Sequence, residues 1–89
     1  MFRITAENEG NNKKVLFLEG KLCQECVKEL QSEIQGILDL GQEVVLDFSK
    51  VTFLHSETAD VLSRFPSNKV TKRKCSLYVR SMLNLKERG

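Results

Sequence analysis

Two short apolar runs, each followed by residues at helical spacing, most constrain how this chain folds. Val15–Leu18 is apolar at every position and predicts a strand buried on both faces. Val44–Phe48 begins with β-branched residues and predicts a second buried strand. Apolar residues at helical spacing follow each run, over about four turns from Cys26 or Val27 and again after His55. Strands joined through helices are therefore expected.

The remaining segments complete an α/β fold. Phe2–Thr5 alternates apolar and polar residues before the turn Glu9–Asn12, which predicts a first strand antiparallel to the second. Ser49–Lys50 is interpreted as a turn, Cys75–Val79 as the last strand, and Ser81–Gly89 as a final helical turn or a frayed end. This order predicts a single small mixed β-sheet, with right-handed crossovers, helices packed on one side and the other face partly open.

The predicted helices carry recognisable end signals. Gly41 lies at the end of the first predicted helix, where a C-cap glycine is typical. Ser56 or Thr58 is the expected N-cap of the second helix, and Pro66 limits that helix.

Length and composition favour a binding module. The chain has 89 residues, enough for one domain over residues 1–89 and short for an enzyme with a deep, walled cleft. Its 40% hydrophobic and 29% charged residues are typical of a globular protein. No apolar run approaches a membrane span, and the N-terminus has no secretory pattern. Three cysteines, two of them closely spaced, argue against a disulfide framework, so reduced thiols and a cytoplasmic location are expected.

Charge is divided unevenly along the chain. Residues 1–62 carry 6 basic and 11 acidic groups, whereas residues 63–89 carry 8 basic and 1 acidic. The basic part would attract phosphates or an acidic partner surface, although a solvated turn explains it equally well. Interleaved aromatic residues and nucleic-acid recognition motifs are missing, so a nucleic-acid partner is not favoured.

The cysteines suggest two kinds of chemistry. Cys23 and Cys26 form a C-x-x-C pair at the mouth of a predicted helix, which would suit a small thiol-disulfide oxidoreductase with Cys23 as nucleophile and Cys26 as resolving thiol. The plainer interpretation is that Cys26 faces the core. Cys75 and His55 would complete a four-ligand zinc set with this pair, but their spacing lacks a second close pair. No metal or cofactor is predicted.

The segment joining the second buried strand to its helix is the main candidate site. His55, Ser56, Glu57 and Thr58, here called the knuckle, open the helix. A helix N-terminus favours an anion, either the Glu57 carboxylate or a phosphate on Ser56 or Thr58. Plain N-capping explains these residues equally well. Adjacent His and Ser residues on a loop seldom point at one another, so no catalysis is predicted.

Residues 44–62, VVLDFSKVTFLHSETADVL, resemble the VVLDLSGVTFIDSSGLGVL signature of STAS domains, the module shared by sulfate transporters and anti-sigma factor antagonists. The sequence LEGKL at residues 18–22 is similar to the L-x-G-x-L that precedes the family's first helix. The resemblance covers residues 2–79 and implies a mixed sheet with helices on one side. In the antagonists it also implies binding to an anti-sigma factor that is a serine kinase, which ends when the knuckle serine is phosphorylated.

The chain departs from this family in three ways. Glu57 takes the position of the usual phosphorylated serine, and its single negative charge imitates a phosphate only in part. Thr58 and Asp60 replace family glycines. The amphipathic helix that usually follows the last strand is expected to be truncated or absent, which would uncover apolar surface and favour a homodimer.

These observations predict a non-catalytic, STAS-like interaction domain that regulates a protein partner. The partner implied by the resemblance is an anti-sigma factor with serine kinase activity, a sensor or a transporter component. Ser56 and Thr58 are the phosphoacceptors left at the knuckle. The predicted contact residues are His55, Ser56, Glu57, Thr58 and Asp60.

Overall fold

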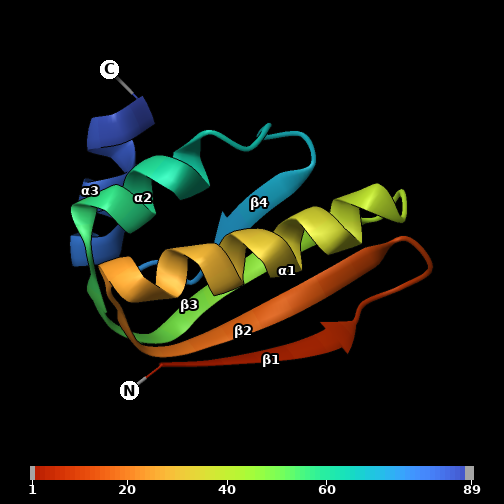
Figure 1. The fold of residues 1–89 in the computed structure, drawn as a ribbon, viewed down its shortest axis with the longest axis horizontal. Coiled ribbons are helices and arrows are strands. Elements are labelled where there is room, and N and C mark those ends of the chain that lie inside the picture. The colour runs from red at the N-terminus through yellow and green to blue at the C-terminus, as the bar shows by residue number, and fades with distance from the viewer. Residues whose placement is uncertain (1, 88–89) are drawn as a thin grey trace.

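The computed structural model describes the backbone of residues 2–87 and the side chains as far as Leu83. Its four strands form one mixed sheet in the order β1-β2-β3-β4, in which β1 is antiparallel to β2 and the other pairs are parallel (Figure 1). The elements are β1 (Phe2–Asn8), β2 (Lys13–Leu22), the 3-10 turn η1 (Gln24–Cys26), α1 (Val27–Asp39), β3 (Glu43–Leu54), α2 (Ser56–Ser63), β4 (Val70–Arg73) and α3 (Leu77–Glu87). The predicted α/β class, mixed sheet and helical connections are confirmed.

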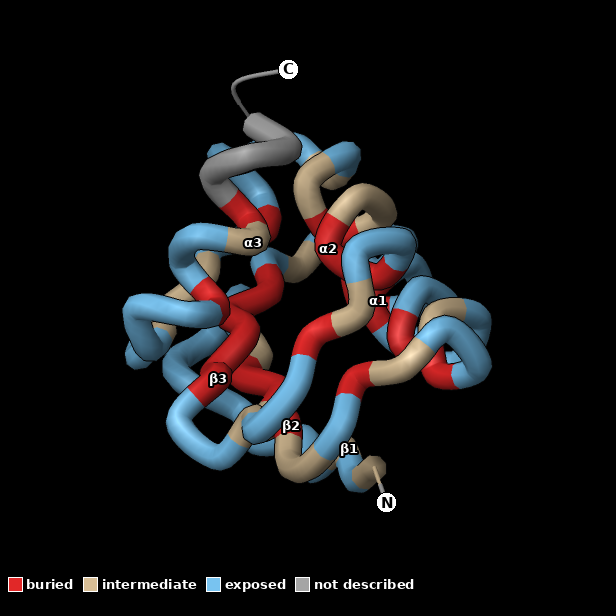
Figure 2. The backbone as a smooth tube through the Cα atoms, turned by 90° about the vertical axis from the view of Figure 1, so that its left-hand side faces the viewer, coloured by how far each residue is buried: buried red, intermediate tan, exposed pale blue. Residues whose placement is uncertain are grey.

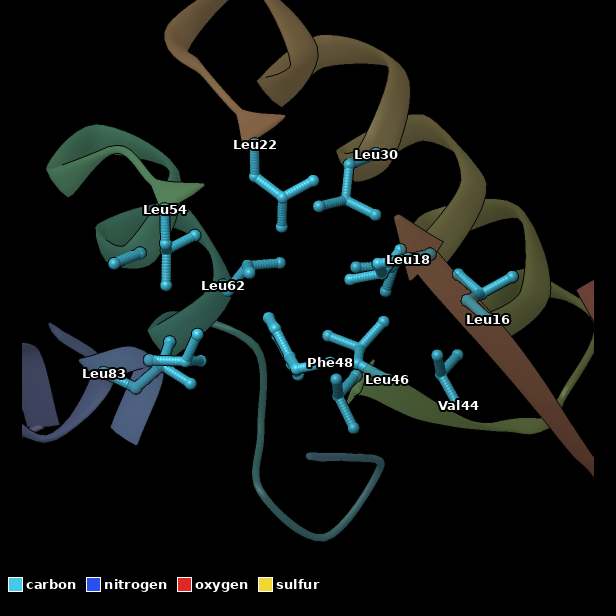
Figure 3. Close-up of a cluster of buried hydrophobic side chains, with 14 of the residues drawn as sticks. Leu16, Leu18, Leu22, Leu30, Val44, Leu46, Phe48, Leu54, Leu62 and Leu83 are labelled. Atoms are coloured by element: carbon cyan, nitrogen blue, oxygen red, sulfur yellow. The ribbon is translucent and has the colours of Figure 1, made fainter. Parts of the chain in front are cut away.

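One hydrophobic core holds the helices against one face of the sheet. Alternate residues of the strands point into it, as expected for a period of two, and they meet the apolar stripes of all three helices (Figure 3). The continuous buried stretch of β3 is Val44–Phe48, in the first half of the strand (red in Figure 2). The strand contribution to the core comprises Leu16, Leu18, Leu22, Val44, Leu46, Phe48, Leu54 and Val70.

The end of α1 confirms the role predicted for Gly41. Gly41 has a φ of 78°, and its N–H donates to the Leu38 carbonyl at 2.9 Å. The N–H of Gln42 donates to the Ile37 carbonyl at 3.3 Å. This pair of hydrogen bonds is the Schellman motif, which needs a left-handed residue at the glycine position.

The turn predicted at Ser49–Lys50 is wrong, because β3 continues through it to Leu54. The Ser49 N–H donates to the Asp47 carboxylate at 2.9 Å, so these turn-forming residues make a local irregularity in the strand instead of reversing the chain. The pairing with β2 shifts by one residue between Phe17 and Glu19, and again after Gly20. Each shift places an extra residue on β3 and bends it, and Leu54 ends opposite Leu22.

The last strand lies earlier than predicted. Residues 75–79 form the end of a turn and the start of a helix, whereas β4 is Val70–Arg73. Val70 is buried and pairs with Val44, while Lys74 takes a left-handed φ of 56° that ends the strand. Ser76 then begins the helix, since its hydroxyl oxygen accepts from the Val79 N–H at 3.2 Å.

The expectation of a truncated or absent final helix is therefore corrected. An earlier strand leaves room for α3, an 11-residue helix whose Val79 and Leu83 are buried in the core. The Tyr78 hydroxyl fastens this helix to the end of β3, because it accepts from the Leu54 N–H at 3.3 Å and donates to the Leu54 carbonyl at 3.1 Å. Arg88 and Gly89, which belonged to the expected frayed end, lie outside the described residues. Dimerisation stays a prediction. The apolar surface that motivated it is largely covered by α3.

No helix lies against the opposite face of the sheet in residues 2–87. Val15, Val45 and Asp47 on this open face are nevertheless buried. The Arg73 side chain extends over it, with its guanidinium carbon 5.9 Å from the centre of the Phe17 ring. Across residues 2–87, no helix has the length and apolar character needed to span a membrane.

Candidate functional site

The candidate site forms where β2 and β3 end side by side. Leu22 pairs with Leu54, and the His55 N–H donates to the Leu22 carbonyl at 2.9 Å. The chain leaves β2 into η1 and α1, and it leaves β3 into the knuckle and α2. The starts of both helices therefore lie together at the carboxyl edge of the parallel strands (Figure 1).

The N-cap of α2 is His55, which corrects the prediction of Ser56 or Thr58. His55 has the extended backbone of an N-cap residue, and its Nδ1 accepts from the Glu57 N–H at 3.1 Å. A neutral ring that accepts at Nδ1 carries its proton on Nε2. The nitrogen that would have to activate Ser56 is thus already engaged by the backbone.

Thr58 is fully buried, so it does not belong to the contact surface that the sequence predicts. Its hydroxyl donates to the Cys23 carbonyl at 3.1 Å. The role of Thr58 is to join α2 to the turn that precedes α1. The Thr58 hydroxyl is both buried and hydrogen-bonded, so the exposed hydroxyl of the knuckle is that of Ser56.

Glu57 is exposed and held in place by a residue that the sequence analysis missed. The Gln24 side-chain amide donates to its carboxylate at 2.8 Å. One turn further along, the half-buried Asp60 accepts from Arg64 at 2.6 Å in an ion pair on the helix surface. Glu57 in the first turn of α2 and Asp60 one turn later therefore place two carboxylates on this helix.

The two cysteines of the C-x-x-C pair adjoin the knuckle. Their sulfur atoms are 3.3 Å apart, with Cys23 half-buried and Cys26 buried. Burial raises the pKa of the Cys26 thiol, and the hydrogen bond with Cys23 raises it further. The plainer interpretation, that Cys26 faces inward, agrees with its burial.

The four residues considered as zinc ligands do not come together in the structure. Within the described part of the chain, no three His, Cys, Asp or Glu side chains gather as metal ligands, so Cys75 and His55 do not join the thiol pair. Cys75 is half-buried, and burial raises its pKa. It lines a hollow of about 430 Å³ between β4 and α3 that collects part of the basic region. The basic residues of this hollow are Lys72, Arg73, Lys74 and Arg80.

Neither a family model nor a curated protein sequence matches this chain. The comparison with solved structures shows the class of fold, which is STAS-like. A solved structure of the anti-sigma factor antagonist SpoIIAA in its unphosphorylated form is similar over 97% of this chain and 84% of that chain. The TM-score is 0.77 and the sequence identity is 15%, a level at which the similarity establishes the fold. The resemblance to STAS domains is thus confirmed for the fold.

Proposed function

We propose that this chain is a non-catalytic interaction module that regulates a protein partner, in the manner of an anti-sigma factor antagonist. The observation that carries the proposal is the fixed Glu57 carboxylate, which is exposed at the start of α2 and held at 2.8 Å by Gln24. A side chain that is already hydrogen-bonded in the free protein loses less conformational entropy when a partner binds it than an unbonded side chain does. The contact surface we propose comprises His55, Ser56, Glu57 and Asp60, with Gln24 added and Thr58 removed.

The engagement of His55 supports a role without catalysis. Its Nδ1 accepts the Glu57 N–H, so the arrangement does not provide a base directed at Ser56. Two open hollows, one between β4 and α3 and one on the exposed side of α1, are lined by residues outside the knuckle, as expected of a domain that binds macromolecules through its surface.

The charge of the surface favours a partner that carries positive groups opposite the start of α2. Glu57 lies at the position that STAS antagonists phosphorylate, so the partner would meet a permanent negative charge there. Ser56 is exposed, and a phosphate on it would gain from the helix N-terminus but repel Glu57. The candidates remain an anti-sigma factor with serine kinase activity, a sensor or a transporter component, in the cytoplasm.

The test is affinity capture with wild type and Glu57→Lys, followed by binding measurements on each purified candidate partner. Glu57→Lys reverses the fixed charge and should weaken binding about tenfold or more. Glu33→Lys makes the same charge change on the exposed side of α1 and should bind like wild type. Circular dichroism checks that both variants fold. Equal affinity of Glu57→Lys and wild type would contradict the proposal.

A small thiol-disulfide oxidoreductase is the second candidate, favoured by the 3.3 Å separation of the two sulfur atoms. In this role Cys23 would attack a substrate disulfide and Cys26 would resolve it. The protein would then accelerate the reduction of insulin by dithiothreitol, and Cys23→Ser would abolish that acceleration. A rate equal to that of dithiothreitol alone would remove this candidate.

A further inference from the structure

We propose that Cys23 and Cys26 form a reversible disulfide that rearranges the knuckle, so that a thiol modification controls the partner-binding surface. The first part, disulfide formation coupled to the knuckle, stands on the geometry of this chain. The second part, control of binding, rests on the proposed function.

The 3-10 turn brings the two thiols into line. Cys23 precedes η1 and Cys26 ends it, and side chains three residues apart eclipse one another in a 3-10 turn. The sulfur atoms already lie 3.3 Å apart, and the Cys26 N–H donates to the Cys23 carbonyl at 3.0 Å. A bond of about 2.05 Å therefore requires a local tightening of one turn.

The two cysteines differ in access, which sets their order of reaction. Cys23 is half-buried and meets solvent, whereas Cys26 is 8% exposed. Burial also raises the pKa of the Cys26 thiol above its ordinary value. An external reagent therefore reaches Cys23 first, and Cys26 acts on the mixed disulfide from within.

The turn that carries the thiols is bonded to the knuckle at three successive residues. The Leu22 carbonyl accepts from the His55 N–H, and the Cys23 carbonyl accepts from the Thr58 hydroxyl. The Gln24 side chain donates to Glu57. A tightening that moves the backbone of residues 23–24 must change at least one of these bonds. The bond to Glu57 is the exposed one and is expected to break first.

The reaction balances with a low-molecular-weight disulfide as oxidant, such as glutathione disulfide. The Cys23 thiolate attacks one sulfur and releases one glutathione thiolate, which takes up the proton that Cys23 lost. Cys26 loses its proton and attacks the Cys23 sulfur, and the second glutathione leaves and is protonated. The protein loses two protons and two electrons, and the glutathione disulfide gains both. A dithiol reductant reverses the reaction.

The experiment uses the full chain with Cys75→Ser, which leaves only the paired thiols to react. The protein, labelled with nitrogen-15, is equilibrated with glutathione disulfide and analysed by mass spectrometry and by amide NMR spectra. We expect the loss of two hydrogen atoms in mass and shifted amide signals at residues 55–58. Dithiothreitol should restore both. Cys23→Ser in the same background should show no shift, and Gln24→Ala should lose the change at Glu57 while keeping that at Thr58.

Two results would overturn the proposal. One is a stable mixed disulfide at Cys23 with no intramolecular bond. The other is an intramolecular disulfide whose formation leaves the amide signals of residues 55–58 unchanged.

Binding is measured separately, on a partner whose affinity Glu57→Lys reduces. Oxidation should weaken that affinity about fivefold, comparable to the loss of one hydrogen bond. An unchanged affinity would overturn the control of binding. The NMR measurement needs no partner, so it tests the disulfide independently of the proposed function. If oxidation shifts the amide signals of residues 55–58 but Glu57→Lys weakens the binding of no partner, the proposed function is overturned and the coupling of the disulfide to the knuckle stands.

Discussion

The two faces of the sheet are stabilised by different means. The face beneath the helices fully buries aliphatic side chains, such as that of Leu46 on β3. The open face buries a carboxylate, Asp47, the next residue on the same strand, at 1% exposure. Alternation along one strand thus places an apolar side chain and a charged one in equally dry positions. The first gains stability from its burial, and the second requires partners that offset the loss of its hydration.

Arg73 is the ion-pair partner of Asp47 on the open face. Thr5 pairs with Phe17, Phe17 with Asp47 and Asp47 with Arg73, so these residues form one row across all four strands. The Arg73 Nε donates to Asp47 at 3.2 Å and its Nη1 donates to Glu9 at 3.1 Å. The bonds to Glu9 and Asp47 raise the pKa of Arg73. One long side chain thus covers the part of the open face around Phe17 and Asp47.

Asp47 stays ionised because its hydrogen bonds outweigh its burial. Burial alone would raise the pKa of its carboxyl group. Hydrogen bonds from the Ser49 hydroxyl and N–H and from Arg73 lower it further than burial raises it, and the resulting pKa is below its ordinary value. The contribution of the open face to the free energy of unfolding should therefore depend on pH, whereas the contribution of the helix face should not.

The largest effect is expected from Leu46→Ala on the helix face. This change leaves a cavity in the core and should reduce the free energy of unfolding by about 2 to 5 kcal/mol. Leu40→Ala is the matched control, because Leu40 is 74% exposed at the end of α1, and it should change the free energy by less than about 0.5 kcal/mol. Urea unfolding followed by circular dichroism measures both. Similar losses in the two variants would contradict the assignment of the core.

An intermediate effect is expected from Arg73→Met on the open face. Methionine keeps much of the apolar length but leaves the buried Asp47 without its cation, so the protein should unfold at lower urea than wild type. The loss should be smaller than that of Leu46→Ala, because Ser49 continues to donate to Asp47. Arg64→Met removes an exposed ion pair and should leave the midpoint almost unchanged. A midpoint for Arg73→Met equal to that of wild type would show that the two faces do not differ in this respect.

The smallest effect is a change of pH dependence in Asp47→Asn. Because the folded pKa of Asp47 is lowered, its stabilisation is complete above the unfolded value of about 4 and is lost as the pH falls through the folded value. The amide introduced by this substitution does not titrate, so the variant should lose less stability than wild type upon acidification below about pH 4. Urea midpoints measured between about pH 7 and pH 2.5 test this. Parallel curves for the two proteins would refute a lowered pKa.

Apart from the second half of β3, where a turn was expected at Ser49–Lys50, the N-terminal two thirds of the fold could be predicted because its signals are local. Apolar runs mark β2 and β3, and helical spacing with Gly41 marks α1 and its end. The C-terminal third failed because β4 carries a single buried residue, Val70, among exposed and charged ones. Residues 75–79 are more apolar than β4, so the sequence pattern favours a strand there instead. The overlooked signal was the spacing of Val79 and Leu83, four residues apart after a capping Ser76.

The candidate site was predicted in part for a related reason. The knuckle is contiguous in sequence, so it could be found from the residues alone. Its contacts with Cys23 and Gln24 join residues more than 30 positions apart, which neither spacing nor composition reveals. Parallel pairing of β2 and β3 brings these segments together, since their carboxyl ends meet at one edge. The burial of Thr58 depends on that same contact.

The hydroxyl of Tyr78 has a consequence for solubility. β4 pairs with β3 only as far as Asp47, so among residues 2–87 no strand lies beside the rest of β3 on that side. Exposed N–H and C=O groups on such an edge can recruit a strand from another molecule and begin aggregation. Tyr78 occupies both groups of Leu54, and its ring stacks on Phe53 with centres 6.4 Å apart. A single phenol thus protects the end of the sheet from intermolecular strand addition, where a longer β4 would otherwise be needed.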